Sequence, residues 1–404
     1  MGQSKEQTVK RRRVFYIPGY DPIHPRRYRE LYRKESGAQG AISGYEVTLA
    51  PKTGGGTYGW HVTGRIDGAE TQADVEVLVW SDIVRDSMSN SIPATYLQLA
   101  RTAWAYIGSG ALWRLMKLRK GPVIAALYPV VFLLVQLGLA LVAAYGLGQI
   151  LALALPDWTA WGGLVIVPFL LNWFRKKDGK FFAYYLMHDY AYSARWKGAN
   201  PAPLEQRLAE FADAIEAALR DDVDEVLVVG HSSGAHLAVS ILADLIRQGR
   251  VPEDGPALGF LSLGQVVPMV SFLPEAKRLR GGLAFLCQRR ELAWVDVTAP
   301  GDGCAFALCD PVSVSGVEPE GGKRWPLVVS AAFTQTLSAE RWKELRWRFF
   351  RLHFQYLCAF DNPGDYDYFK ITAGPITLRE RYDGRVPSKS RIERPVNKFT
   401  SVLE

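Results

Sequence analysis

Apolar residues follow two different patterns along this chain. Over most of its length, short apolar runs alternate with longer segments that have apolar residues at helical spacing. The short runs predict strands at Val14–Ile17, Gly44–Ala50, Gly59–Ile66, Ala73–Trp80, Glu225–Val229, Leu258–Leu263, Leu292–Val297 and Pro326–Ala331. The longer segments predict helices, among them Pro25–Lys34, Pro203–Arg220 and Ala235–Arg247. Strands that alternate with helices form a mostly parallel sheet with helices on both faces, so the predicted fold class is α/β.

The second pattern is a nearly uncharged block over about residues 122–174, in which Asp157 is the only charged residue. Its first run, Val123–Leu155, is longer than the roughly 20 apolar residues that a membrane-spanning helix needs. Its second run, Trp158–Phe174, lies at the short end of that range and contains Gly and Pro residues. The block predicts an inserted two-helix membrane hairpin. A buried core hairpin, or a second segment that is re-entrant or interfacial, remains an alternative.

The flanks of this block favour the membrane interpretation. Positive charge near the ends of a span marks the cytoplasmic side, and Trp residues prefer the interface. Basic residues lie on both sides: Arg114, Lys117, Arg119 and Lys120 before the block, and Arg175, Lys176, Lys177 and Lys180 after it. We therefore expect two spans in a cytoplasmic (inner) membrane, with both ends on the cytoplasmic side. The preceding Tyr96–Met116 predicts a helix, either on the membrane surface or facing a core.

Composition narrows the class of protein further. The chain has 404 residues, of which 48% are hydrophobic, which excludes a disordered protein. Its four Cys residues show no metal-ligand spacing, so we expect reduced thiols and neither a metal nor a cofactor. The net charge of +7 favours an anionic lipid bilayer as partner. No motif supports binding to nucleic acid.

A short motif, Gly230-His231-Ser232-Ser233-Gly234, fits the pattern G-x-S-x-G. It directly follows the predicted strand Glu225–Val229 and directly precedes a predicted helix. A serine on such a tight turn projects its hydroxyl above the sheet, and the glycines Gly230 and Gly234 permit the cramped backbone. We therefore expect Ser232 to be a nucleophile. The alternative is a Gly/Ser loop that only begins a helix.

This motif resembles the nucleophile elbow of the α/β-hydrolase superfamily, in particular its lipase- and esterase-like serine hydrolases. The resemblance covers roughly Arg13–Ser89 and Pro203–Thr372 and leaves out the hairpin. It implies that an acid and then a histidine follow the serine along the chain. We expect the hydrolase domain in two parts, residues 1–89 and 201–375, around a membrane-associated insertion at 90–200, with a polar tail at 376–404.

The order implied by the resemblance selects His353, because it is the only histidine beyond the helix that follows the motif. A serine hydroxyl needs such a base to take its proton. Asp302, on the loop after the predicted strand Leu292–Val297, is the expected acid that orients the imidazole. Asp296 and Asp310 are the alternatives for the acid. Asp302 could instead be a turn residue, and His353 a packed one.

The resemblance also implies an oxyanion hole formed by the backbone N–H groups of Ser233 and of one residue after the first strand, for which Tyr20 is the expected donor. The HGGG form of many lipases is absent. The sequence thus predicts a membrane-embedded serine hydrolase that cleaves a lipid or other acyl ester through Ser232, Asp302 and His353. An acyltransferase that uses the same triad and a non-catalytic membrane scaffold are the alternatives. The oligomeric state is left open.

Overall fold

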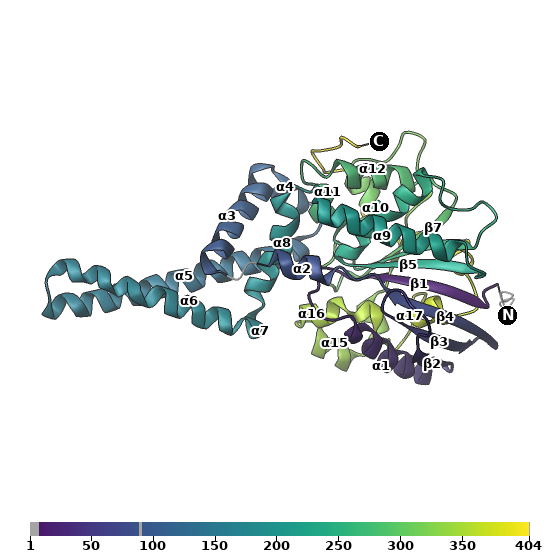
Figure 1. The fold of residues 1–404 in the computed structure, drawn as a ribbon, viewed down its shortest axis with the longest axis horizontal. Helices are drawn as coiled ribbons and strands as arrows, with labels where there is room; N and C mark the ends of the chain where they lie inside the picture. The colour runs from purple at the N-terminus through teal and green to yellow at the C-terminus, as the bar shows by residue number, and fades with distance from the viewer. Residues whose placement is uncertain (1–7, 89–90, 404) are drawn as a thin grey trace.

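The computed structural model describes residues 8–88 and 91–403. The remaining residues, which include the start of the N-terminal segment and the domain boundary expected at residue 89, lie outside that description. Figure 1 shows an α/β body from which a long helical arm projects.

The eight strands of the described residues belong to one sheet, in the order β2-β3-β4-β1-β5-β6-β7-β8. The strands β4, β1, β5, β6, β7 and β8 run parallel to one another, whereas β2 and β3 add an antiparallel edge. Their bounds are β1 Arg11–Ile17, β2 Glu46–Pro51, β3 Gly59–Ile66, β4 Ala69–Val77, β5 Glu225–His231, β6 Ala257–Leu263, β7 Leu292–Thr298 and β8 Leu327–Ser330. The predicted α/β class with a mostly parallel sheet is confirmed, and the chain segments before and after the insertion share this sheet.

The helices before residue 200 are α1 Arg26–Ser43, α2 Ser81–Ser87, α3 Ile92–Gly108, α4 Ala111–Leu115, α5 Lys120–Ala154, the 3₁₀ helix η1 Asp157–Val165, α6 Ile166–Lys176, α7 Asp178–Phe181 and α8 Ala183–Arg195. Those after it are α9 Ala202–Leu219, α10 Ser233–Arg247, α11 Val267–Ser271, α12 Lys277–Leu286, α13 Pro311–Val314, α14 Phe333–Thr336, α15 Ala339–Leu345, α16 Phe349–His353, the 3₁₀ helix η2 Gln355–Leu357, α17 Tyr368–Ala373 and α18 Leu378–Arg381.

Helices cover both faces of the sheet (Figure 1). Side chains alternate between the faces of a strand, and in β1 Phe15 and Ile17 pack in the core under α9, α10 and α12. Val14 and Tyr16 point the other way, into the core under α1 and α17. Because both faces are covered, β5 is buried along its whole length, which is the reason for its uninterrupted apolar sequence.

The segment between β4 and β5 forms the insertion, and α5, η1 and α6 make up its projecting arm (Figure 1). The helix α5 has 35 residues and continues through Pro129. The returning limb lies against a stripe of small residues on α5. A Cβ on Gly163 would overlap the Ala144 carbonyl oxygen, and a Cβ on Gly148 would overlap the Ala160 carbonyl oxygen. Glycine at both positions therefore lets the two backbones touch.

Apolar side chains cover the outside of the arm. Val142, Tyr145 and Leu153 on α5 are 70%, 71% and 87% exposed. Of the described helices, α5 alone is long and apolar enough to cross a membrane, as judged by length and composition.

Two helices expected from sequence are broken in the structure. The predicted Tyr96–Met116 helix is interrupted at Gly110, whose φ of 77° is left-handed, so it forms α3 and α4. The apolar run Trp158–Phe174 is a 3₁₀ helix followed by α6, because the close approach of Gly163 to α5 lies within it.

The C-terminal tail follows the surface of the body and is tied to it. The buried guanidinium of Arg280 donates to the carbonyl oxygen of Ser401 at 2.8 Å, and Leu403 N–H donates to the carbonyl oxygen of Lys277 at 3.1 Å. Further upstream, Ile392 forms an isolated parallel bridge with Cys309. The tail thus fixes the outer side of α12.

Candidate active site

Ser232 occupies the sharp turn between β5 and α10. Its φ of 56° and ψ of −121° lie in a region that residues other than glycine rarely adopt. Such strain persists only where the surrounding structure enforces it. A Cβ on Gly230 would lie 2.7 Å from the Cα of Ala235, and one on Gly234 would overlap the Ile17 carbonyl oxygen. Both motif glycines are therefore required by the close packing of the turn.

His353 and Asp302 form a buried hydrogen-bonded pair next to this turn. The Nδ1 atom of His353, at the end of α16, lies 2.7 Å from Oδ2 of Asp302, on the loop after β7. Asp302 also accepts hydrogen bonds from the Tyr356 hydroxyl at 3.0 Å and from the Cys304 N–H at 2.8 Å. Burial by itself would raise the pKa of Asp302, but the electrostatic interaction with His353 and these hydrogen bonds hold the pKa below its ordinary value.

The two alternative acids lie elsewhere. Asp296 lies within β7, next to Ser262 on β6, and accepts a hydrogen bond from the Ser262 hydroxyl. Asp310 caps the N-terminus of α13 and pairs with Lys323 at 2.8 Å. Of the three carboxylates, the structure therefore brings Asp302 to His353.

The expected oxyanion donors flank Ser232. Ser233 is the first residue of α10, where backbone N–H groups have no partner within the helix. Tyr20 lies on the loop after β1, which touches the turn so closely that a Cβ on Gly19 would lie 3.0 Å from the Cβ of Ser232. Among the described residues, no acceptor takes a hydrogen bond from the N–H of Ser233 or of Tyr20. Both donors are therefore available to an oxyanion.

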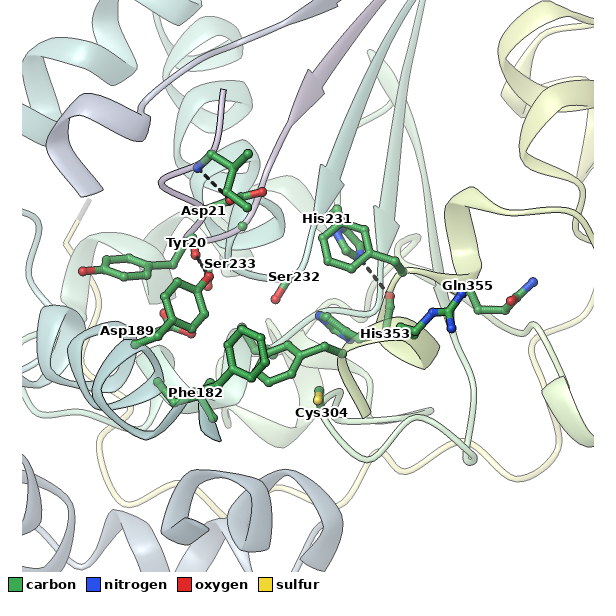
Figure 2. Close-up of a pocket in the computed structure, with 18 of the residues that line it drawn as sticks. Tyr20, Asp21, Phe182, Asp189, His231, Ser232, Ser233, Cys304, His353 and Gln355 are labelled. Atoms are coloured by element: carbon green, nitrogen blue, oxygen red, sulfur yellow. Dashed lines mark hydrogen bonds between the residues drawn. The ribbon is translucent and has the colours of Figure 1, made fainter. Parts of the chain in front are cut away.

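Two residues that support His353 were missed in the sequence analysis. His231 is buried, and its Nε2 atom lies 3.0 Å from the His353 carbonyl oxygen (Figure 2). Burial and the neighbouring His353 ring lower the pKa of His231 to about 3, so the ring is neutral and donates through Nε2. Tyr356 holds Asp302 from the other side. His231 belongs to the motif itself and Tyr356 lies three positions after His353 in the chain, but their contacts depend on how α16 folds back over β5.

A cavity of about 760 Å³ opens in front of Ser232 and His353. Figure 2 shows both side chains at this cavity, together with Tyr20, Ser233, Asp189 and Cys304. Its wall also includes residues at the root of the arm, among them Pro122 on α5, Phe182 beside α8 and Leu186 on α8. The cavity thus extends from the turn of Ser232 to the point where the arm leaves the body. No sequence signal marked the contribution of α8.

Asp302, Cys304 and His353 also form a group whose ligand-type atoms lie within 4.8 Å of one another. Burial raises the pKa of the Cys304 thiol well above its ordinary value, which disfavours the thiolate that binds metals. Both carboxylate oxygens of Asp302 already accept hydrogen bonds, and a metal ion on His353 Nδ1 would displace the one from His353. The arrangement fits a histidine whose ring is oriented by a carboxylate better than it fits a metal centre.

Comparison with known protein families, curated proteins and solved structures gives no match for this chain.

Proposed function

We propose that this protein is a membrane-embedded serine hydrolase that cleaves an acyl ester. The observation that carries the proposal is the strained conformation of Ser232 at the carboxyl end of β5, beside the buried pair of His353 and Asp302. Backbone strain of this kind costs free energy, and strained residues are found mostly at reactive sites. Strand, turn and helix have the arrangement that the nucleophile elbow requires.

The proposed reaction uses each group in one role. The Asp302 carboxylate accepts a hydrogen bond from the Nδ1–H group of His353 and so keeps the proton on Nδ1; Nε2 therefore carries a lone pair and takes the proton of the Ser232 hydroxyl. The serine oxygen attacks the ester carbonyl, and the N–H groups of Ser233 and Tyr20 stabilise the negative oxygen. His353 then protonates the leaving alcohol. Water repeats the sequence on the acyl-enzyme, which releases the acid and restores Ser232.

The dimensions of the arm support its place in a bilayer. At 1.5 Å per residue, the 35 residues of α5 extend about 52 Å, which exceeds the roughly 30 Å of a hydrocarbon core. The returning limb combines the 9 residues of η1 with the 11 of α6. Because a 3₁₀ helix rises about 2.0 Å per residue, this limb extends about 35 Å, which is also sufficient. We therefore propose that both limbs span the bilayer; the length and composition of α5 make it the better supported of the two spans.

Charges and aromatic rings support the same placement. Trp158 and Trp161, near the tip of the arm, are 74% and 76% exposed, and Trp173, near its root, is 53% exposed. Trp residues prefer the two membrane interfaces. Lys and Arg residues precede α5 and follow α6, which favours a cytoplasmic location for the body. In addition, Trp347 is 72% exposed between two arginines, so this loop can contact an anionic lipid surface.

The cavity connects these two parts of the proposal. Because its wall includes Pro122, Phe182 and Leu186 at the root of the arm, an acyl chain that leaves the bilayer along the arm would reach Ser232 without crossing water. The proposed substrate is therefore an ester with at least one lipid chain.

Hydrolysis by two neighbouring serine variants tests the proposal. The purified full chain in detergent should hydrolyse a p-nitrophenyl acyl ester, and Ser232→Ala should lower kcat by about 10³-fold or more. Ser233→Ala is the matched control, because it keeps the backbone N–H and should retain activity within about tenfold. Folded wild-type protein without esterase activity, or equal rates for the Ser232→Ala variant, would instead favour a non-catalytic scaffold.

A further inference from the structure

Asp189 is a carboxyl group in the wall of the catalytic cavity that the proposed mechanism does not use. It lies on α8, on the opposite side of the cavity from His353 (Figure 2). Within the described part of the chain, no hydrogen bond or ion pair engages its carboxyl oxygens, and the residue is partly exposed at the cavity surface. In a largely apolar wall, a carboxyl group without a protein partner has oxygens that are free to bind a cation that enters the cavity.

Tyrosine rings share the cavity wall with Asp189. They belong to Tyr20, Tyr106, Tyr185 and Tyr190. Three of their hydroxyl groups are engaged elsewhere: Tyr20 with Ser87 at 2.6 Å, Tyr106 with the Met269 carbonyl at 2.9 Å, and Tyr185 with the Tyr20 carbonyl. These three residues therefore offer the carboxyl group no hydrogen bond, and they present ring surface to the cavity. Ring faces attract cations, most strongly where water is excluded.

The charged groups of the cavity also favour a cationic ligand. Burial raises the pKa of Asp189 to about 7, with the His353 ring acting against the rise, so a nearby cation would favour the ionised form. Each lysine and arginine among the described residues of the lining is already paired with a carboxylate, which reduces its attraction for an anionic ligand. The pairs are Arg27–Asp21 at 3.0 Å, Lys34–Glu35 at 3.4 Å, Arg341–Asp361 at 3.3 Å and Arg351–Glu344 at 3.4 Å.

We propose that Asp189 and the tyrosine rings around it form a subsite for a positively charged amine or quaternary ammonium group of the ester substrate. The inference rests on the proposed function, since it defines the substrate class for the same catalytic serine. Asp189 would bind the cation while the ester carbonyl lies between Ser232 and the oxyanion donors. Esters of amino alcohols are then preferred over esters of neutral alcohols of the same shape.

Two hexanoyl esters of the same shape test the subsite. One is hexanoylcholine, and the other is its neutral isostere, in which a carbon atom replaces the quaternary nitrogen. Wild-type protein should show a kcat/KM about tenfold or more higher for the choline ester, since a desolvated contact with a carboxylate and ring faces favours the charged ester. Asp189→Asn should lose this preference but retain hydrolysis of the neutral ester. Glu344→Gln, a second carboxylate of the same cavity lining, is the matched control and should keep the preference.

Binding to the Ser232→Ala variant separates the subsite from the chemistry. Calorimetric titration should show hexanoylcholine bound about tenfold more tightly than the neutral ester, and the additional Asp189→Asn change should remove the difference. If neither ester is hydrolysed but the binding preference remains, the proposed function fails and the subsite stands. Equal kcat/KM and equal affinity for the two esters in the wild-type site would overturn the subsite while leaving the hydrolase intact. Should the Asp189 variants not fold, the wild-type comparison of the two esters decides alone.

Discussion

Replacing Asp302 by asparagine changes the chemistry of the site with little change in volume. The carboxylate accepts hydrogen bonds from the His353 ring, the Tyr356 hydroxyl and the Cys304 N–H. An asparagine whose oxygen keeps the bond from Cys304 turns its NH₂ group toward the His353 ring. Nδ1 must then accept that bond, so the proton moves to Nε2, and His353 can no longer take a proton from Ser232.

The expected loss of kcat is large, because in the variant the His353 tautomer with its proton on Nε2 dominates. Loss of the base in this way costs on the order of 10³- to 10⁴-fold in kcat, equivalent to about 4–5 kcal/mol of barrier. The assay is hydrolysis of a soluble p-nitrophenyl ester by the full chain in detergent, with KM measured separately. We expect the loss in kcat, while KM stays within a fewfold of the wild-type value, because Asp302 does not touch the substrate.

The matched control is Asp296→Asn, in the strand β7 that leads into the same loop. Asp296 is equally buried but faces Ser262 and not His353, so its variant should retain kcat within about tenfold. The reasoning is refuted if Asp302→Asn retains wild-type kcat, or if Asp296→Asn shows the larger loss.

Three further outcomes are expected. Burial raises the pKa of Asp296 from 3.8 to about 8, so the folded state holds a proton that the unfolded chain releases, and wild-type stability falls as pH rises from about 4 to 8. Asp296→Asn should remove up to roughly 6 kcal/mol of that fall in denaturant unfolding, whereas parallel pH profiles would contradict the assignment. Deleting residues 123–174 should abolish hydrolysis of lipid-dispersed esters but spare short soluble esters, and equal loss on both in a folded protein would disprove delivery along the arm. Gly234→Ala should push the Ile17 carbonyl away and displace the Tyr20 loop, with a loss of about 10²-fold in kcat that circular dichroism can separate from unfolding.

Local sequence patterns were sufficient to predict the framework of the site. An apolar run before Ser232 and helical spacing after it identify a strand, a turn and a helix, and these are properties of neighbouring residues. The predicted strands therefore lie close to the observed ones, and the ends of β5 and β7 bring Ser232 and Asp302 to one end of the sheet, where His353 joins Asp302. This follows because the carboxyl ends of parallel strands meet at one edge.

Contacts between segments that are distant in the sequence could not be predicted from these local patterns. The support of His353 by the His231 ring spans 122 positions, and Asp189 reaches the cavity only because α8 folds back against the body. The 3₁₀ conformation around Gly163 depends on contact with Ala144, on the opposite limb of the arm. In each case the outcome is decided by tertiary packing, which a pattern along the chain does not contain.

The most direct test of the central claim is covalent labelling of Ser232 by a fluorophosphonate probe, followed by mass spectrometry of the digested protein. A serine activated by His353 reacts with such a probe, whereas an ordinary surface serine does not. We expect one adduct per chain, on the peptide that contains Ser232, and its loss in both Ser232→Ala and His353→Ala. A folded wild-type protein that remains unlabelled, or that carries the adduct on a different residue, would contradict the account.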